Sequence, residues 1–296
     1  MRPALSLLIP AHNEEQVIGR CLASALDGVD PPDVEIAVVC NGCSDSTVER
    51  ARQVLARTGF RLGESGGGGA QVIDLAAASK VAALNAGDTA LTVFPRVYLD
   101  ADIELDAATL LLMAAALEGD DAAVASPAVD FDLDGRPWPV RAFYRVWQQT
   151  PYLTHGLIGN GVYALSEAGR RRFEQFPPLT ADDLFVQRLF APQERRIVTS
   201  GHYTVHVPRT VRDLVKVRTR VYYGNAELAR EGFGGEAPLD SASTELLGVA
   251  RRSLREWPAL AVYVAINLVG KLRATRRHRY GRTGVWDRDE SSRQQG

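Results

Sequence analysis

Short apolar runs alternate with amphipathic segments over about the first 130 residues. Five apolar runs predict strands, at 4–9, 34–40, 72–75, 97–100 and 122–126, and 129–133 continues the last of them. The segments between them predict helices at 14–26, 44–57, 79–91 and 106–118. Continuous apolar runs, rather than alternating ones, are typical of strands buried on both faces. The pattern therefore predicts an α/β fold, with a mostly parallel central sheet flanked by helices.

The pattern is less regular after residue 135. Helices are predicted at 140–152, 181–190 and 211–228, with a strand at 161–164 and one or two strands within 196–207. We therefore expect an α/β domain over residues 1–208, a helical C-terminal region over 209–282 and a polar tail over 283–296.

Residues 257–270 are almost wholly apolar, but this run is shorter than the ~20 residues that cross a bilayer. Six basic residues follow it: Lys271, Arg273, Arg276, Arg277, Arg279 and Arg282. An apolar helix beside a cationic cluster suits an anionic membrane surface. A buried helix and a subunit interface, such as that of a homodimer, are the alternatives.

Composition narrows the class of protein. The chain is 46% hydrophobic and 24% charged, which is ordinary for a globular protein, and its net charge of −2 gives no reason to expect nucleic acid as a partner. Its 3 cysteines are too few for a disulfide framework and fit a reducing compartment. No signal peptide precedes the first strand, so we expect a cytoplasmic protein, with the inner face of the cell membrane as a second expected location.

The strand at 97–100 ends in two carboxylates, Asp100 and Asp102, separated by one residue. Alternate side chains of a strand share a face, so the two can converge on one cation. Carboxylates suit Mg²⁺ or Mn²⁺, which bind through one or two of them plus substrate phosphates. The alternative is an N-cap, with Asp102 or Asp106 beginning the next helix.

Polar residues follow three other strands or begin the helix after them. They lie in segments 10–14 (PAHNE), 41–47 (NGCSDST) and 80–87 (KVAALNAG). The carboxyl ends of parallel strands meet at one edge of a sheet, where open α/β sheets bind ligands. Amide and acid groups there can pair with a base and ribose, and a lysine with phosphates. Together the segments predict a nucleotide site.

In this order and spacing, these segments resemble the family 2 glycosyltransferases, which have the GT-A fold, over about residues 4–190. The resemblance implies a nucleotide-sugar donor, with Pro10, Ala11, Asn13, Glu14 and Asn41 lining the nucleotide pocket and Lys80 near the base or phosphates. It also implies that Asp102 is the direct ligand of Mn²⁺ or Mg²⁺ and that Asp100 binds the ribose or the metal. Many members carry an Asp where this chain has Cys40 or Asn41, which leaves the base open.

Two adjacent carboxylates, Asp182 and Asp183, begin a predicted helix. They are either acids favoured by the helix dipole or a catalytic pair in which one carboxylate accepts a hydroxyl proton. The segment resembles the Glu-Asp motif of the family, which makes Asp183 the candidate base and places Asp182 at the acceptor.

Four further residues are candidates. Asn160 and Gly161 resemble the loop that faces the donor sugar, and Arg220 resembles the arginine of the Gln-x-x-Arg-Trp helix of polymerising relatives. The Gln and Trp of that helix are missing, which favours a single transfer over processive synthesis. His206 is a candidate third metal ligand or a surface histidine, and Arg220 is either a diphosphate ligand or part of a solvated basic face.

The sequence thus predicts a metal-dependent, inverting glycosyltransferase of the hexosyltransferase type. It would move a sugar from a nucleoside-diphosphate donor, with UDP favoured, to a hydroxyl of a lipid, saccharide or small molecule. A nucleotidyltransferase that makes nucleotide sugars and a degenerate, membrane-associated scaffold are the alternatives.

Overall fold

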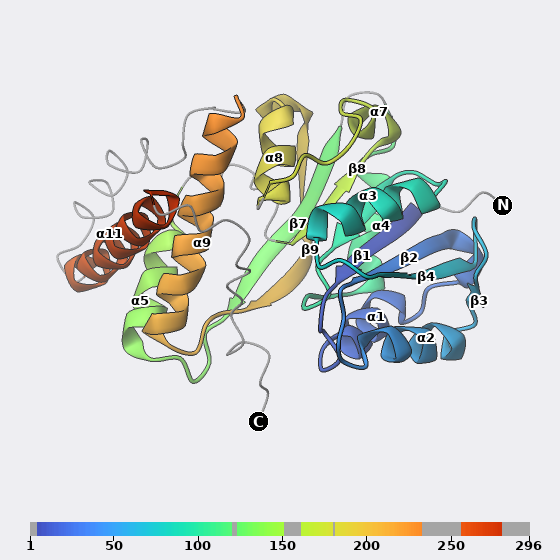
Figure 1. Ribbon diagram of the computed structural model, residues 1–296, viewed down its shortest axis with the longest axis horizontal. Helices are drawn as coiled ribbons and strands as arrows, with labels where there is room; N and C mark the ends of the chain where they lie inside the picture. Colours follow the sequence, from blue (N-terminus) through green and yellow to red (C-terminus); the bar gives the residue numbers. More distant parts are fainter. Residues whose placement is uncertain (1–4, 120–122, 151–160, 180, 233–255, 280–296) are drawn as a thin grey trace. The chain divides into compact units, whose positions relative to one another are not determined.

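The computed structural model describes residues 5–119, 123–150, 161–179, 181–232 and 256–279 (Figure 1). Its strands form one sheet in the order β3-β4-β2-β1-β5-β8-β7-β9-β6. The strands are β1 (Leu5–Ala11), β2 (Val34–Asn41), β3 (Arg61–Leu62), β4 (Gly69–Leu75), β5 (Arg96–Leu99), β6 (Glu104–Leu105), β7 (Val124–Asp132), β8 (Val162–Leu165) and β9 (Arg195–His206). The predicted α/β architecture is confirmed.

Helices connect and cover these strands. They are α1 (Ile18–Leu26), α2 (Thr47–Arg57), α3 (Lys80–Ala90), α4 (Ala107–Ala115), α5 (Trp138–Trp147), α7 (Glu167–Arg170), α8 (Asp182–Leu189), α9 (Val211–Arg230) and α11 (Trp257–Arg279). Two 3₁₀ turns lie at Pro31–Asp33 and Pro192–Glu194. No helix within the described ranges combines the length and the apolar content that a membrane span requires.

The centre of the sheet is parallel and fully buried. Every residue of β1 and β2 is buried, and β1 pairs in parallel with β2 on one side and β5 on the other. β4 continues the parallel set beyond β2, whereas β8 pairs antiparallel with β5. The carboxyl ends of β1, β2, β4 and β5 therefore meet at one edge, which is the edge expected to bind the ligand.

The first helix begins later than predicted, at Ile18 rather than near residue 14. Asn13 has a positive φ of 54°, so the chain turns sharply after β1. The carbonyl of Glu14 then accepts hydrogen bonds from the amides of Val17 and Ile18, which starts the helix. The side chain of Asn13 makes no cap for α1 and instead accepts a hydrogen bond from the amide of Ser44, at 2.8 Å.

The structure decides between the two candidate caps after β5. The carboxylate of Asp106 accepts a hydrogen bond from the amide of Thr109 at 2.6 Å and is the N-cap of α4. Asp102 lies in the turn between β5 and β6 and is exposed. The carboxylate of Asp102 is therefore not used as a helix cap.

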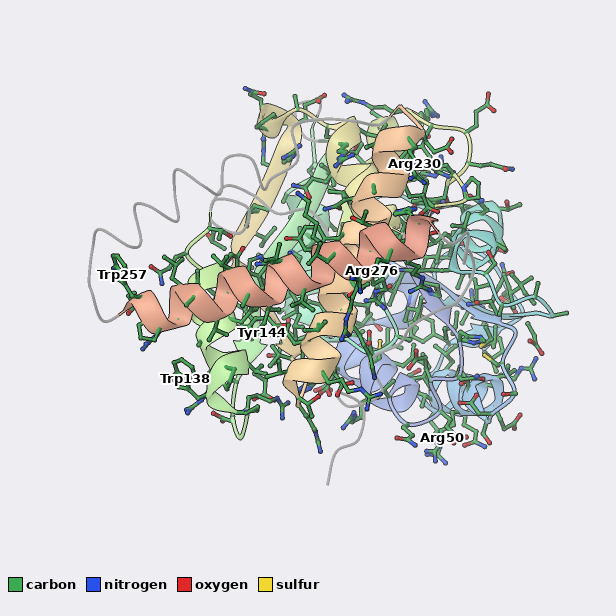
Figure 2. The ribbon with its side chains drawn as sticks, turned by 60° about the vertical axis from the view of Figure 1, so that its left-hand side comes forward. Arg50, Trp138, Tyr144, Arg230, Trp257 and Arg276 are labelled. Carbon is green, nitrogen blue, oxygen red and sulfur yellow. The ribbon has the colours of Figure 1, made fainter. Side chains whose placement is uncertain are left out.

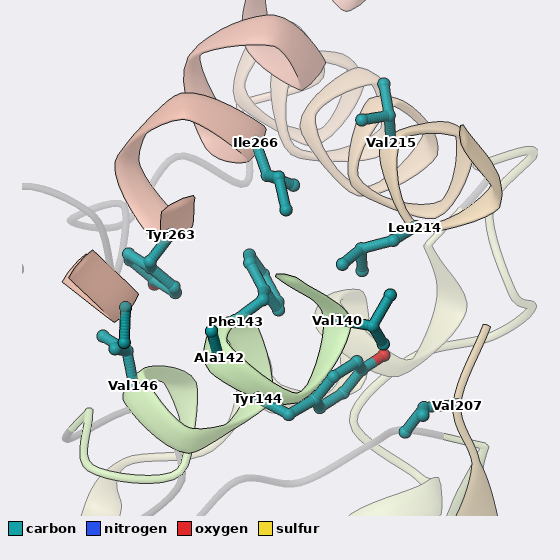
Figure 3. Packing of buried hydrophobic residues seen from close by; sticks show 11 residues of the cluster. Val140, Ala142, Phe143, Tyr144, Val146, Val207, Leu214, Val215, Tyr263 and Ile266 are labelled. Carbon is teal, nitrogen blue, oxygen red and sulfur yellow. The ribbon is translucent and has the colours of Figure 1, made fainter. Parts of the chain in front are cut away.

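The chain forms two compact units. The sheet unit comprises Met1–Asp130, Ile158–Pro178 and Leu189–Thr204, and the helix unit comprises Phe131–Leu157, Leu179–Arg188 and Val205–Gly296. In the helix unit, α5, α9 and α11 pack around a cluster that includes Phe143, Leu214 and Tyr263 (Figure 3). The predicted domain boundary at residue 208 stays a prediction.

Candidate functional site

Two loops at the ligand edge of the sheet unit hold each other in place. The loop after β1 and the loop after β2 are joined by hydrogen bonds in both directions. The amide of Glu14 donates to the hydroxyl of Thr47 at 2.7 Å, and the amide of Glu15 donates to the carboxylate of Asp45 at 3.2 Å. The carboxylate of Glu15 in turn accepts from the amide of Ser46 at 3.0 Å. The loops are therefore preorganised as one rigid rim.

Asn41 ties the ends of the two strands together beneath this rim. Its side chain is 4% exposed and its amide nitrogen donates to the carbonyl of Ala11 at 2.8 Å. The ring of His12 bonds to the backbone carbonyl of Asn41. Pro10 and Ala11 are buried within β1, and the side chain of Glu14 is 7% exposed. All five predicted pocket residues thus lie at the end of β1 or β2, or in the loop after β1.

Asp45 is held in its charged form by this loop. Burial on its own would raise the pKa of Asp45, but hydrogen bonds from the Thr47 hydroxyl and from the amides of Glu15 and Thr47 outweigh it. The net result is a pKa below the ordinary value of the group. Asp45 and Thr47 belong to segment 41–47 but were not predicted as individual site residues, although a Ser/Thr/Asp run before a helix is a recognised capping signal.

The end of β5 carries a salt bridge. The Nζ of Lys80, at the start of α3, lies 2.7 Å from Oδ1 of Asp100. Lys80 is presented by a helix that Ser79 caps through the amide of Ala82. The structure therefore brings together two of the predicted ligand residues, an ammonium group and a carboxylate, at the edge where a diphosphate is expected.

Gly161 lies directly against this pair. Its carbonyl accepts a hydrogen bond from the amide of Asp100 at 2.7 Å, and its φ is 87°. A Cβ atom at this position would lie 2.6 Å from Cδ1 of Ile103 and 2.9 Å from Oδ2 of Asp100. Only glycine fits here, because any side chain would displace the carboxylate. The neighbouring candidate, Asn160, lies outside the described residues.

The thiol of Cys21, on α1, lies 3.9 Å from the backbone carbonyl oxygen of Asp100. Burial raises the pKa of the Cys21 thiol, and the nearby carboxylates of Asp102 and Asp100 raise it further. Among the described residues, no group of three or more His, Cys, Asp or Glu side chains is arranged to hold a metal ion. Two carboxylates are too few to hold a cation by protein ligands alone. They suit a cation that also binds the phosphates of a substrate.

The remaining candidates lie in the helix unit. Asp182 and Asp183 begin α8; the side chain of Asp182 is 6% exposed, and the carboxylate of Asp183 accepts from the amide of Leu184 at 2.7 Å. A Cβ atom on Gly224 of α9 would lie 3.0 Å from the Cβ of Ala181. The close approach of α9 thus fixes the start of α8 and the two carboxylates there.

His206 ends β9 and bonds to a carboxylate. Its Nδ1 lies 3.1 Å from Oδ2 of Asp132, and this hydrogen bond is the main cause of a lowered pKa for Asp132. Metal-ligating histidines commonly donate one ring N–H to a carboxylate, which leaves the other nitrogen for the metal. The contact with Asp132 is therefore compatible with a ligand role and equally with a structural one.

Arg220 is exposed on α9, whereas Arg218 is 7% exposed. Nε of Arg218 donates to Oδ1 of Asn267 at 2.9 Å, and its guanidinium lies over the rings of Phe143, Trp147 and Tyr222. Arg220 was the predicted site residue because it alone matches the arginine of the Gln-x-x-Arg-Trp helix, and that resemblance gives no sign that Arg218 is buried. Only the partners from α5 and α11 distinguish the buried position from the exposed one.

The model of the family "Glycosyl transferase family 2" matches residues 6–172, so the chain belongs to this family of glycosyltransferases. No curated protein matches the chain.

Solved structures support the GT-A fold. A mannosyltransferase from Pyrobaculum calidifontis, in complex with GDP-Man and Mn²⁺, has a TM-score of 0.67 at 18% identity, covering 95% of this chain and 88% of that one. Glucosyl-3-phosphoglycerate synthase from Mycobacterium tuberculosis, in complex with Mg²⁺ and UDP, has a TM-score of 0.52 at 20% identity, covering 79% and 81%. TarS of S. aureus has a TM-score of 0.54 at 14% identity, covering 97% and 94%.

Proposed function

We propose that this enzyme transfers one sugar, with inversion, from a nucleoside-diphosphate sugar to an acceptor hydroxyl, in a reaction that depends on Mn²⁺ or Mg²⁺. The observation that carries the proposal is the salt bridge between Lys80 and Asp100, packed on Gly161 at the carboxyl end of β5. Asp102 follows it in an exposed turn and is not used as a helix cap.

The nucleotide binds at the rim formed by the loops after β1 and β2. Glu14 and Asn41 lie at the ends of these strands, and Asn13 is fixed by its hydrogen bond to Ser44. UDP is the proposed nucleotide, and Asn41 is the proposed contact of the uracil ring. The proposed role of the Lys80 ammonium is to neutralise a phosphate, and that of Asp100 is to accept a hydrogen bond from the ribose; their salt bridge at the end of β5 supports this pairing of roles.

Asp102 is the proposed direct metal ligand, because one oxygen of Asp100 already faces Lys80. His206 is a further proposed ligand: its Nδ1 bonds to Asp132, which would leave Nε2 for the metal. When bound, the cation supplies positive charge that stabilises the departing nucleoside diphosphate.

Asp183 acts as the general base and removes the proton of the acceptor hydroxyl, whose oxygen then attacks the anomeric carbon from the face opposite the diphosphate. Asp182 positions the acceptor, and Gly161 lies beside the donor sugar. The proposed donor contact of Asn160, which lies outside the described residues, rests on the family resemblance alone. Arg220 is exposed and available to a phosphate of the donor. The bond from the anomeric carbon to the diphosphate breaks as the new glycosidic bond forms.

The missing Gln and Trp near Arg220 support a single transfer over polymerisation. Family membership favours the transferase over a nucleotidyltransferase, and the presence of Asp100, Asp102 and Asp183 argues against a degenerate scaffold. All three cysteines are free, as a reducing compartment would keep them, which supports a cytoplasmic enzyme.

Isothermal titration with UDP and with GDP, each with and without Mn²⁺, tests the proposal. We expect one of the two nucleotides to bind at least about tenfold more tightly with Mn²⁺, and Asp102→Asn to remove this gain. Asp106→Asn is the matched control, because Asp106 caps α4 and has no proposed role in binding. Equal binding with and without Mn²⁺, or an undiminished gain in Asp102→Asn, would contradict the proposed site.

A further inference from the structure

Helix α11 has two apolar faces, and the other helices that the structure describes cover only one of them. Its inner face packs against α5 and α9 through the buried side chains of Ala259, Tyr263 and Ile266. Its outer face exposes five large apolar side chains: Trp257 (56%), Val264 (47%), Leu268 (55%), Val269 (39%) and Leu272 (53%). These are half of the exposed large apolar residues found in the described part of the chain. The exposure is therefore concentrated on one helix.

Four of these residues form a continuous stripe. Trp257, Val264, Leu268 and Leu272 follow one another at spacings of seven, four and four residues, which places them on one side of a helix. At 1.5 Å per residue the stripe is roughly 22 Å long. Large apolar side chains gathered on one exposed face mark an interaction surface, whereas scattered ones do not.

The charges on α11 indicate what this surface meets. The helix contains no Asp or Glu, and Lys271, Arg273 and Arg276 are exposed next to the last turn of the stripe. None of these three cations forms a salt bridge with a residue that the structure describes. Figure 2 shows Trp257 at one end of α11 and Arg276 toward the other. The apolar stripe thus runs into a cationic patch whose three side chains form no salt bridge within the described part of the chain.

The positions of two exposed tryptophans also indicate what kind of surface this is. Trp138, at the start of α5, is 52% exposed, and α5 is one of the two helices that pack against α11. Tryptophan is enriched where one end of a side chain is apolar and the other is wet, as at the headgroup level of a bilayer. Exposed tryptophans thus begin two of the helices in this cluster.

We propose that the outer face of α11 docks on an anionic phospholipid surface, with the helix lying parallel to the bilayer plane. The stripe enters the boundary between headgroups and acyl chains, and Lys271, Arg273 and Arg276 pair with lipid phosphates. A second copy that docked through its own α11 would cover the apolar stripe but would bring no counter-charge for the three cations, because α11 contains no Asp or Glu. An anionic lipid surface satisfies both features. This interaction is independent of the proposed sugar transfer.

Co-sedimentation of the full chain with vesicles tests the proposal. We expect binding to vesicles of phosphatidylcholine with 30% phosphatidylglycerol, and little to phosphatidylcholine alone. Leu268→Glu should weaken the partition about 30-fold, because it removes a leucine that the bilayer would bury. Arg273→Gln and Arg276→Gln should each weaken it about fivefold. The fluorescence of Trp257 should shift to the blue on binding, relative to a Trp257→Phe background.

Leu111→Glu is the matched control, since Leu111 is a similarly exposed leucine on α4 of the sheet unit. We expect it to bind vesicles as the wild type does, and thermal melting to show that both variants are folded. Failure of the wild type to bind anionic vesicles overturns the proposal, as does undiminished binding of Leu268→Glu. A dimer in lipid-free solution that Leu268→Glu dissociates, without vesicle binding, would identify a second copy as the occupant instead.

Discussion

In the sheet unit the buried carboxylate of Asp88 lies between two guanidinium groups, whereas in the helix unit the buried guanidinium of Arg218 lies among aromatic rings. Asp88 is 2.5 Å from Nη1 of Arg96 and 2.7 Å from Nε of Arg170, and it accepts the hydroxyl of Tyr98 at 2.7 Å. Arg218 has no carboxylate partner among the described residues; its polar contact is Asn267.

The two arrangements have different energetic consequences. A buried ion pair is costly to break, because removing one partner leaves the other charge unpaired in a medium of low dielectric constant. A buried cation held by rings and one amide leaves no opposite charge behind when it is removed. Asp88 joins α3 to β5 and α7, so the strand that presents Asp100 is fixed by charge. The helix unit is fixed mainly by apolar packing.

The largest expected effect is a loss of transfer rate, caused by a substitution in the helix unit that does not alter the sheet unit. We expect Asp183→Asn to slow transfer about 10²–10⁴-fold, because an amide cannot accept the acceptor proton. Release of the nucleotide from its sugar donor measures the rate, and titration should show unchanged nucleotide binding. Asp213→Asn, a similar acid in the first turn of α9, is the control. Loss of nucleotide binding in Asp183→Asn would contradict the division of roles between the units.

Breaking the ion pair should produce the largest loss of stability. We expect Arg96→Met to lower the free energy of unfolding by about 3–5 kcal/mol, since it removes one of the two cations at Asp88. Urea unfolding followed by circular dichroism measures the change. A loss below about 1 kcal/mol would show that Arg170 alone is sufficient.

Glu35 is a second buried carboxylate of the sheet unit, and it tests the cost of unpairing such a group where its partners are backbone amides and not cations. Glu35 is 1% exposed and accepts hydrogen bonds from the amides of Gly66, Thr92 and Val93, at 2.6, 2.7 and 3.0 Å. We expect Glu35→Gln to cost about 1–3 kcal/mol of unfolding free energy, because the new NH₂ group faces backbone donors. Glu64→Gln, at an exposed neighbour, should be neutral; equal effects of the two changes would contradict the assignment.

Removing the guanidinium of Arg218 should lower the stability of the fold less than removing that of Arg96. We expect Arg218→Met to lower the free energy of unfolding by about 1–2 kcal/mol, because methionine keeps the apolar packing, and the hydrogen bond to Asn267 and the cation–π contacts are lost without leaving an unpaired charge. The same urea titration compares it with Arg96→Met. A loss as large as that of Arg96→Met would show that the two units bury charge at similar cost.

The smallest effect concerns pH. The folded pKa of Asp45 lies below its unfolded value near 4, so its contribution to stability is present above that value and is lost as pH falls through the folded pKa. We expect Asp45→Asn to be less stable than the wild type at pH 7, and the difference to shrink toward pH 3. Asp30→Asn, at an exposed site, provides the comparison. A difference that stays constant with pH would exclude the titration of Asp45 as its cause.

The sequence predicted those features that depend on local pattern. Continuous apolar runs identified the parallel strands, and Ser79 marked the start of α3. The predicted start of α1 was wrong, because the positive φ of Asn13 depends on a hydrogen bond to Ser44 in another loop. The choice between Asp102 and Asp106 as cap also needed the structure, since both precede a helical segment.

Features that depend on long-range partners were missed. Asp88 and Arg170 are 82 positions apart in the chain, and no spacing rule joins them. Arg218 and Arg220 differ only in which side of α9 they occupy. Which face of α11 is covered became evident only when α5 and α9 were seen packed against it. Local pattern thus identified the elements, but not the contacts that give individual residues their roles.

The chain passes several times from one unit to the other, because each unit consists of three separate segments. Strands β7 and β9 each begin in the sheet unit and end in the helix unit. A ribosome therefore completes α5 long before it makes α9 and α11, the helices that cover it. A fragment ending near residue 208 would contain the whole sheet but expose the apolar side of α5. Neither unit can be released by a single proteolytic cut.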